Sequence, residues 1–338
     1  MRVLVTGGAG YIGSHAVREL LRADHDVTVL DNLSKGHRES VDMRANFIRG
    51  DMSDSVLVRR VLRDNRIEAV LHFAAFIEVG ESVSDPFKYY RNNFASTLSL
   101  LESMRAEGVN KFVFSSTAAV YGNPKGVPIH ETDPREPINP YGRSKMMTEM
   151  ALEDASRAYG LGYAILRYFN VAGASPDGTI GEAHEPESHL IPRVLAAANE
   201  GRAIGIYGTD YNTPDGTCIR DYIHVVDLVN AHILALEKIK LGEGRVYNLG
   251  SESGFSVREV IEACRKATGK SFPVEEHERR PGDPDSLVAS SSRIRELGWT
   301  REYPDLETMI LHAWKWHTTH PHGYRRLHAP APEALQAH

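Results

Sequence analysis

A short apolar run leads into a glycine-rich turn in Leu4-Val5-Thr6-Gly7-Gly8-Ala9-Gly10-Tyr11-Ile12-Gly13. Gly8, Gly10 and Gly13 have the spacing G-x-G-x-x-G, and Gly7, Gly10 and Gly13 have a variant with two intervening residues. Turns of this kind join a strand to a helix and let backbone N–H groups approach a pyrophosphate at the helix N-terminus. The stretch therefore predicts a dinucleotide site, against the alternative of a purely structural βα turn.

An acidic residue, Asp31, ends the second predicted strand. A carboxylate at this place accepts hydrogen bonds from ribose hydroxyls and repels a 2′-phosphate, so the expected cofactor is NAD rather than NADP. The alternative is a helix-capping aspartate. That reading leaves the agreement of strand, turn, helix and acid unexplained.

The first half of the chain alternates short β-branched runs with longer helical patterns, which is typical of βαβ units. The expected strands are Val3–Thr6, Val27–Asp31, Asn46–Arg49, Ala69–Phe73, Lys111–Ser115 and Tyr163–Arg167. The expected helices are His15–Ala23, Val56–Asn65, Asn93–Glu107 and Ser144–Tyr159. The predicted fold class is α/β: a Rossmann-type doubly wound parallel sheet with a smaller, interleaved α/β lobe that binds substrate.

After about residue 170 the regular alternation of strand and helix patterns ends. Ala172–Glu187 is rich in Gly, Pro and Ser, as in a functional loop. We expect a dinucleotide-binding domain over 1–170, with a return to it at about 220–250, and a substrate-binding lobe over 171–324. The return rests on Arg220–Leu228, a helical Val229–Lys238 and a strand-like Val246–Leu249. Residues 325–338 contain Ala-Pro-Ala-Pro-Glu and are expected to be a disordered tail.

The composition of the 338 residues is ordinary for a soluble globular protein, with 41% hydrophobic and 25% charged residues. A formal net charge of −6 without a long basic run argues against a nucleic-acid partner. No apolar run approaches the ~18 residues of a membrane span, and the N-terminus lacks a signal-peptide pattern. The only two cysteines, Cys218 and Cys264, are far apart and indicate a reduced pair. We therefore expect a cytoplasmic location.

The second chemical signal is Tyr141-Gly142-Arg143-Ser144-Lys145, which opens a helical pattern. Residues i and i+4 share a helix face, so the Tyr141 hydroxyl and the Lys145 ammonium are expected at one site. A free tyrosine has a pKa near ~10, and a nearby ammonium together with a positive nicotinamide ring would lower that pKa. We expect Tyr141 to act as an acid/base and Lys145 to lower its pKa. By itself, the pentapeptide is equally compatible with a surface helix that carries both residues by chance.

Three hydroxyl residues, Ser115, Ser116 and Thr117, follow the apolar run Phe112-Val113-Phe114. Active sites of doubly wound sheets lie at the carboxyl ends of strands, where these hydroxyls are expected. Thr117 can hydrogen-bond a substrate oxygen as a proton leaves it. In isolation the three would be unremarkable hydroxyls at a strand end, so the combination with Tyr141 and Lys145 is what indicates catalysis.

Together these motifs resemble the extended short-chain dehydrogenase/reductase superfamily and, within it, the UDP-glucose 4-epimerase (UDP-galactose 4-epimerase) family. The resemblance covers nearly the whole chain to about Tyr324. It implies inversion at C4 of a UDP-hexose through a transient 4-keto sugar, with NAD as a retained catalyst and no net redox change. The matching stretches are Val5-Thr6-Gly7-Gly8-Ala9-Gly10-Tyr11-Ile12-Gly13-Ser14-His15, Leu30-Asp31-Asn32-Leu33-Ser34, His72-Phe73-Ala74-Ala75, Val79-Gly80-Glu81-Ser82-Val83, Arg167-Tyr168-Phe169-Asn170 and Arg220-Asp221-Tyr222-Ile223-His224-Val225.

The resemblance also implies the residues that contact NAD. Among them, Asp51 and Met52 would hold the adenine, and Tyr168 would flank the nicotinamide. Thr117, Tyr141 and Lys145 match the family's catalytic hydroxyl, base and lysine. The full expected cofactor set is Gly7, Gly10, Tyr11, Ile12, Gly13, Asp31, Asn32, Ser34, Asp51, Met52, Phe73, Ala74, Ala75, Asn93, Ser115, Tyr141, Lys145 and Tyr168.

The substrate contacts that the resemblance implies lie mostly in the second half of the chain. Arg220 and Arg280 would supply planar forks for a diphosphate, and Tyr207 a face for uracil. Taken singly, each arginine is equally well a surface charge. The full expected substrate set is Thr117, Tyr141, Asn170, His189, Leu190, Tyr207, Arg220, Tyr222, Arg280, Asp283 and Leu287.

Leu287 stands where family members restricted to UDP-glucose and UDP-galactose often carry a tyrosine that closes the sugar pocket. The smaller side chain implies room for a 2-acetamido group, and hence activity on UDP-GlcNAc and UDP-GalNAc. The family's homodimers also imply that Asn93–Glu107 and Ser144–Tyr159 pair with their copies as a four-helix bundle. Packing within one chain explains these amphipathic patterns equally well.

Two other functions were weighed against epimerisation. Nucleotide-sugar 4,6-dehydratases and decarboxylases resemble this chain, but they usually carry an acidic residue directly after the threonine, where Ala118 and Ala119 follow Thr117 here. A non-catalytic NAD-sensing regulator would not need Tyr141 and Lys145 together with Thr117. Both alternatives are therefore weaker predictions.

No metal site is expected from the sequence. Four histidines, His312, His317, His320 and His322, lie near the C-terminus. The first two are five residues apart and do not share a helix face, and no carboxylate completes a ligand set.

Overall fold

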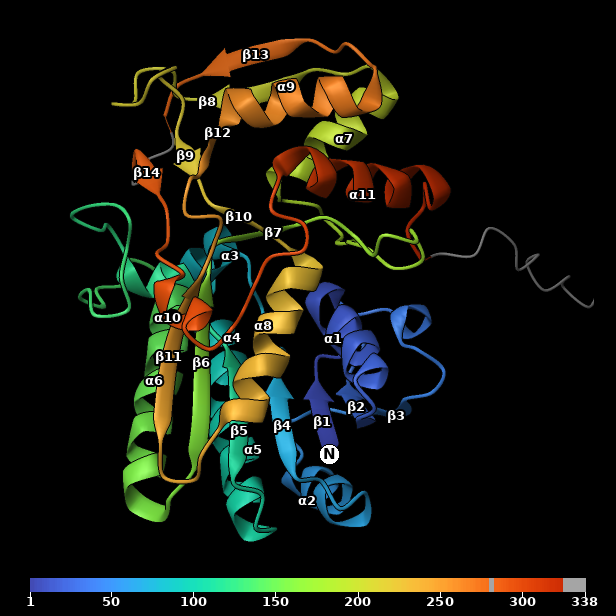
Figure 1. Ribbon diagram of the computed structural model, residues 1–338, viewed down its shortest axis with the longest axis vertical. Helices are drawn as coiled ribbons and strands as arrows, with labels where there is room; N and C mark the ends of the chain where they lie inside the picture. The colour runs from blue at the N-terminus through green and yellow to red at the C-terminus, as the bar shows by residue number, and fades with distance from the viewer. Residues whose placement is uncertain (280–282, 325–338) are drawn as a thin grey trace, which may run out of the picture.

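A parallel sheet of seven strands forms the centre of the molecule, in the order β11-β6-β5-β4-β1-β2-β3 (Figure 1). The computed structural model describes residues 1–279 and 283–324. Strand order reverses beside β1, which pairs with both β2 and β4. The predicted Rossmann-type, doubly wound fold is confirmed. The seven strands are β1 (Arg2–Thr6), β2 (Asp26–Asp31), β3 (Asn46–Arg49), β4 (Ala69–His72), β5 (Lys111–Ser115), β6 (Gly162–Tyr168) and β11 (Gly244–Leu249).

Helices cover both faces of this sheet because its strands are apolar on both sides. On one face α1 (Tyr11–Arg22) and α8 (Val225–Lys238) pack over Val3 and Val5. On the other face Leu4, whose side chain points the opposite way along the pleat, packs with three helices. These are α2 (Ser55–Asp64), α5 (Ser96–Ala106) and α6 (Pro140–Tyr159).

A second group of elements lies beyond the carboxyl edge of the sheet (Figure 1). Its core joins Ile191, Ile261 and Ile310, which come from three different helices. The chain enters this group after β6, returns to the large sheet through α8 and β11, and leaves it again. The strands here are β7 (Asn170–Ala172), β8 (Ile204–Tyr207), β9 (Ile219–Arg220), β10 (Tyr222–His224), β12 (Phe255–Ser256), β13 (Val274–His277) and β14 (Ser286–Leu287). The helices are α7 (Leu190–Glu200), α9 (Val257–Thr268) and α11 (Leu306–Thr319).

Short helices connect the larger elements, among them two 3₁₀ turns, Arg38–Ser40 and Ala118–Tyr121. The helices α3 (Val79–Ser84) and α4 (Pro86–Tyr89) precede α5, and α10 (Ser292–Arg295) packs against β11. A π-helical turn, Tyr90–Ala95, leads directly into α5. None of the helices among the described residues has both the length and the apolar character that a membrane span requires.

Helix α6 begins four residues before the predicted start at Ser144. Asn139 is its N-cap, and the Asn139 side chain accepts a hydrogen bond of 2.8 Å from the N–H of Gly142. Pro140 then occupies the first turn, where its missing N–H costs nothing. The earlier start places Tyr141 in the first turn of the helix, at the carboxyl edge of the sheet.

Candidate active site

A cleft of about 590 Å³, counted with the space open to solvent, lies at the carboxyl edge of the sheet near β1 and β2. The cleft brings together residues from five separate stretches of the chain, as expected where strand order reverses. Its lining also includes Lys35, Gly36 and Asn92, which the sequence analysis did not single out. The predicted cofactor residues that line it are Gly7, Gly10, Asp31, Asn32, Ser34, Asp51, Met52, Phe73, Ala74 and Ala75.

The glycine turn is shaped so closely that side chains are excluded at two of its positions. Gly7 has φ +74°, and a Cβ there would lie 2.6 Å from the Ala74 nitrogen. A Cβ on Gly13 would lie 2.0 Å from the Gly7 carbonyl oxygen. Gly10 is the N-cap of α1, and neither a side-chain cap nor an acidic first-turn residue competes for the first N–H groups of α1. This terminus fits a pyrophosphate group.

Asp31 is held firmly at the rim of the cleft. Its two carboxylate oxygens accept hydrogen bonds from the backbone N–H groups of Ala9, at 2.9 Å, and Leu33, at 2.8 Å. Each oxygen keeps a second lone pair for a ribose hydroxyl. Asn32 donates to Asp51 at 2.7 Å, which links the two sides of the cleft.

Three predicted cofactor residues have their side chains directed elsewhere. The Tyr11 hydroxyl donates to the Gly173 carbonyl at 2.7 Å, and Ile12 packs against the core under α1. Asn93 lies in the π-helical turn and is buried. Its side-chain amide bonds both backbone groups of Phe76 at 2.9 Å. Asn93 therefore fixes the segment that lines the cleft rather than lining it.

The predicted catalytic residues meet where β5 ends and α6 begins. The side chain of Thr117 lies close enough to Tyr141 to favour its phenolate. One helical turn further on, Lys145 Nζ donates to the Ser115 carbonyl oxygen at 2.8 Å. The Ser115 hydroxyl in turn bonds the hydroxyl of Tyr168, at the end of β6. The structure thus brings five predicted residues into one group beside the cleft, in which four side chains are buried and Tyr141 is half-buried.

Burial governs the protonation of this group. It raises the pKa of Tyr141 to about 12, against the effect of the nearby Thr117 side chain and with a further rise from the charge of Glu78. It lowers the pKa of Lys145 from its usual 10.5 to about 7, against the charge of Glu149, which favours the ammonium. The expected lowering of the Tyr141 pKa by Lys145 is therefore wrong for the chain alone. The lysine is directed at the Ser115 carbonyl, and the dry site disfavours the phenolate.

A buried ion pair beneath these residues was missed by the sequence analysis. Glu149, one turn after Lys145 on α6, bonds Arg167 of β6 through both carboxylate oxygens, at 2.9 and 2.6 Å. It also accepts from the Ser116 hydroxyl at 2.6 Å and from Arg135 at 3.1 Å. The i+4 spacing from Lys145 is the signal that would have found it.

The predicted substrate residues lie across the carboxyl edge, around β7, β9 and β14. The Asn170 side chain donates to the Asp221 carbonyl at 3.1 Å. Arg220 lies 3.3 Å from the Asp283 carboxylate. Leu287, which pairs with Arg220 across the β9–β14 ladder, packs against a small apolar cluster that contains Ala118.

The remaining substrate predictions fall in different surroundings. Tyr222 is buried in the core of the second group of elements, beside Phe255. Tyr207 stacks on His277, with ring centroids 5.0 Å apart. His189 and Leu190 lie where the long loop enters α7. Arg280 lies outside the described residues, as does the predicted tail 325–338.

Comparison with known proteins identifies the family. Residues 3–250 match the model of the NAD dependent epimerase/dehydratase family. The chain belongs to this family. The UDP-glucose 4-epimerase of Lacticaseibacillus casei is 52% identical over 327 residues, which are 96% of this chain and 99% of that relative.

Two solved structures are similar to this chain in three dimensions. A crystal structure of a UDP-glucose 4-epimerase superposes with a TM-score of 0.93 at 49% identity, covering 96% of this chain and all of that one. The Bifidobacterium longum UDP-glucose 4-epimerase in complex with NAD⁺ and UDP has a TM-score of 0.90 at 41% identity, covering 96% and 100%. The resemblance seen in the sequence motifs is confirmed.

The buried Lys145 makes the stability of the cofactor-free protein depend on pH. Its pKa is lower in the folded chain, so between pH about 7 and 10.5 the unfolded chain binds a proton that the folded chain does not. The free energy of unfolding should therefore rise with pH across this range, by up to ~1.4 kcal/mol per pH unit relative to a Lys145→Met variant. Urea unfolding of both proteins from pH 7 to 9.5 measures this difference. A constant difference would contradict the buried, titrating lysine.

Proposed function

We propose that this enzyme is an NAD-dependent UDP-glucose 4-epimerase, which inverts C4 of UDP-glucose and UDP-galactose through a transient 4-keto sugar. The observation that carries the proposal is the Thr117 side chain close to the Tyr141 hydroxyl, beside the cleft that the predicted NAD residues line. It places two hydroxyls together at the carboxyl end of β5. The relatives' activity and the bound NAD⁺ and UDP of the Bifidobacterium structure support the same reaction.

NAD, when bound, accepts a hydride from the sugar C4 and returns it. In our proposal Tyr141 takes the proton of the 4-hydroxyl, and Thr117 holds the same oxygen by a hydrogen bond. Lys145 fixes the Ser115 carbonyl and brings positive charge near the phenol. The 4-keto sugar then rotates and presents its other face. The hydride returns to C4, Tyr141 gives back the proton, and C4 is inverted.

We assign the predicted cofactor residues of the cleft to NAD, with Asp31 on the adenosine ribose and the N-terminus of α1 on the pyrophosphate. We assign the substrate residues to the UDP moiety, and Arg220 supplies the diphosphate contact in the described part of the chain. Arg220 carries a planar fork that suits phosphate oxygens. Its present partner, Asp283, belongs to the same proposed set.

Elimination chemistry is the weaker alternative. A 4,6-dehydratase needs an acid close to the catalytic threonine, and Ala118 and Ala119 follow Thr117 in a short 3₁₀ turn. Ala118 is buried in an apolar cluster, so this place offers no proton donor. A non-catalytic NAD regulator leaves the closeness of Tyr141, Thr117 and Lys145 unexplained.

Replacing Tyr141 by phenylalanine removes the proposed acid/base and leaves the ring. We expect kcat for UDP-galactose to fall by about 10²–10⁴-fold, the range of general acid–base catalysis, while bound NAD stays at the wild-type level. Steady-state rates and the NAD released on denaturation measure the two effects. Turnover close to wild type in Tyr141→Phe would overturn the proposed role.

The sugar specificity is proposed to include N-acetylhexosamines. Leu287 packs against the apolar cluster that contains Ala118, directly after Thr117. We propose that a larger side chain at position 287 would enter the sugar pocket. We expect the wild-type enzyme to interconvert UDP-GlcNAc and UDP-GalNAc. Leu287→Tyr should abolish that activity and keep turnover of UDP-glucose.

Separate assays with UDP-glucose and UDP-GlcNAc, with product identification by NMR, test this. Leu287→Met is the matched control, because it keeps nearly the same volume and should keep both activities. Absence of N-acetyl turnover in the wild type, or its survival in Leu287→Tyr, would reject the assignment.

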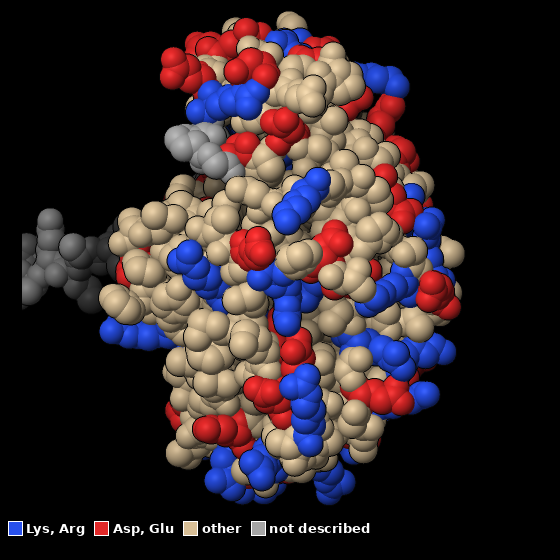
Figure 2. Space-filling view, turned by 90° about the vertical axis from the view of Figure 1, so that its left-hand side faces the viewer, with Lys and Arg blue, Asp and Glu red and all other residues tan. Residues whose placement is uncertain are grey.

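We also propose a homodimer through a four-helix bundle of α5 and α6 from each copy, in a cytoplasmic protein. The two cysteines are unbridged, which suits a reducing compartment. Figure 2 shows the side that carries α6, where uncharged areas separate scattered charges. On α6, Met150 keeps 48% of its surface exposed.

A charge at Met150 should split this proposed dimer, because it would be buried without a partner. We expect Met150→Glu to sediment as a monomer at concentrations at which the wild type sediments as a dimer. Met43→Glu is the control, since Met43 is exposed but lies away from α6. A monomeric wild type, or a dimeric Met150→Glu protein, would contradict the bundle.

A further inference from the structure

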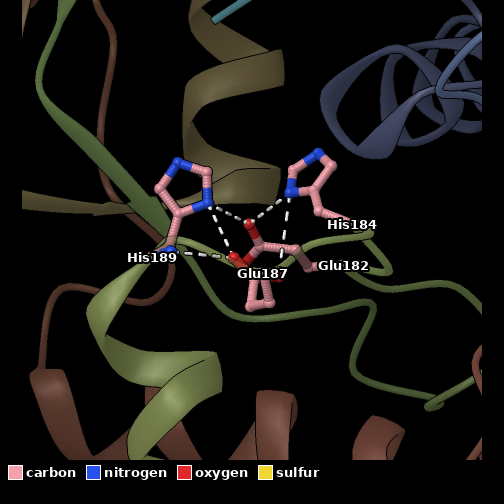
Figure 3. Close-up of side chains that lie close together, drawn as sticks. All are labelled: Glu182, His184, Glu187 and His189. Carbon is pink, nitrogen blue, oxygen red and sulfur yellow. Dashed lines mark hydrogen bonds and ion pairs between the residues drawn. The ribbon is translucent and has the colours of Figure 1, made fainter. Parts of the chain in front are cut away.

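Four potential metal ligands come from one stretch of eight residues, Glu182-Ala183-His184-Glu185-Pro186-Glu187-Ser188-His189. The side chains of Glu182, His184, Glu187 and His189 each direct one nitrogen or oxygen at a common point (Figure 3). These four atoms all lie within 4.8 Å of one another. The sequence analysis assigned no metal, because it examined the C-terminal histidines and not this loop.

The distances between the ligand atoms suit a tetrahedral ion. Glu182 Oε1 lies 3.0 Å from His184 Nδ1 and 2.8 Å from His189 Nδ1. Glu187 lies 3.1 Å from His189 Nδ1 and 3.8 Å from His184 Nδ1. An ion bound at ~2.0–2.2 Å by nitrogen and oxygen has ligand atoms roughly 3.3–3.6 Å apart. The three shorter contacts would therefore open by a few tenths of an ångström around the ion, and the longest would close.

A second observation is that hydrogen bonds account for only part of the cluster: Glu187 Oε1 bonds both the backbone N–H and the ring Nδ1 of His189, at 2.8 and 3.1 Å. His184 Nδ1 is buried and makes no hydrogen bond within the described chain, although a carboxylate oxygen is 3.0 Å away. Its lone pair is thus unused at the centre of the group. The carboxylate of Glu182 is almost fully buried, and a second carboxylate faces the same histidines. Two carboxylates this close need positive charge between them. In the metal-free chain a protonated His189 supplies it, because against its burial both carboxylates raise the pKa of His189 to about 11, and an ion would take the place of this proton.

The loop backbone is fixed around the cluster from both sides. The Glu182 carbonyl accepts from Trp316 Nε1 of α11 at 3.0 Å. The next carbonyl, of Ala183, accepts from His37 at 2.9 Å, and that of Glu185 from Lys35 at 3.0 Å. The ligands are therefore held in place before an ion arrives, which lowers the entropic cost of binding.

We infer that this cluster is a structural zinc site, which closes the loop onto the N-terminus of α7. Two imidazole nitrogens and two carboxylate oxygens are ligands that zinc accepts, whereas Mg²⁺ and Ca²⁺ prefer oxygen alone. The four protein ligands fill a tetrahedron and leave no open position for a reacting water. The ion neutralises both carboxylates and binds His189 through Nδ1. His189 and its neighbour Leu190 both belong to the proposed UDP-binding set, and His189 keeps its backbone and Nε2 for that role.

The test uses the untagged full-length enzyme, purified without chelator and measured by mass spectrometry for metals. We expect about one zinc per chain. Removal of zinc by a chelator should lower the unfolding temperature by several degrees, and ZnCl₂ should restore it. His184→Ala and Glu187→Gln should each retain less than about a tenth of the zinc, with wild-type NAD content as evidence of folding.

The matched control is His312→Ala. His312 also faces another histidine, with His224 Nε2 at 3.0 Å from its Nδ1, but the two do not belong to a four-ligand group in the described chain. This variant should keep its zinc. X-ray absorption of the zinc-loaded wild type should show four nitrogen and oxygen ligands and histidine scattering, without relying on any variant.

Two results would overturn the inference: no zinc bound with no response to ZnCl₂, or zinc retained by both ligand variants. The first would make the cluster an ion-pair network, and the second would place the zinc elsewhere. Metal content and unfolding temperature do not depend on turnover. Failure of the zinc site is therefore distinguishable from failure of the proposed epimerase reaction.

Discussion

The active site depends on one buried ion pair, between Glu149 of α6 and Arg167 of β6. Both side chains are almost fully buried and meet through two hydrogen bonds of 2.9 and 2.6 Å. Removing either partner of such a pair leaves a buried charge and costs about 3–5 kcal/mol. The pair fixes α6 against the carboxyl edge of the sheet, and α6 carries Tyr141 and Lys145.

The Glu149 carboxylate also acts on the residues beside Tyr141. Glu149 accepts from Ser116, directly before Thr117, so the strand end and the helix share one anchor. Its charge also counteracts the burial that lowers the pKa of Lys145. The chain alone does not make Tyr141 a strong base, since burial raises its pKa to about 12. In our proposal the positive charge of the bound cofactor lowers the pKa of Tyr141, so that the tyrosine can act as a base.

Local patterns in the sequence predicted the fold, and they also predicted which side chains meet beside the cleft. The glycine turn fixes a βα unit by its backbone geometry, and the i+4 spacing of Tyr141 and Lys145 needs only a helix. The Glu149–Arg167 pair was harder to predict because its partners come from a helix and a neighbouring strand. A sequence pattern shows charge proximity but not burial, which raises the pKa of Tyr141 in the chain alone. The lowering of this pKa by Lys145 and the nicotinamide ring together stays a prediction for the NAD-bound enzyme.

The group of potential metal ligands in the loop before α7 was not predicted, for a different reason. Its composition indicated a functional loop, but the spacing E-x-H-x-x-E-x-H was visible in the sequence and was not examined. Only the folded loop shows that all four side chains turn inward, with Trp316 and His37 holding its backbone from opposite sides.

The substrate residues also differ in setting, since Arg220 faces Asp283 while Tyr222 is buried in the core.

The central claim is that the hydride removed from C4 returns to the same carbon in a closed active site, with no net redox change. The most direct measurement is conversion of UDP-galactose labelled with deuterium at C4, followed by NMR of the UDP-glucose formed. We predict that the product keeps the deuterium at C4, and that unlabelled substrate in D₂O gains none there. Loss of the label to solvent, or uptake of solvent deuterium at C4, would contradict the account.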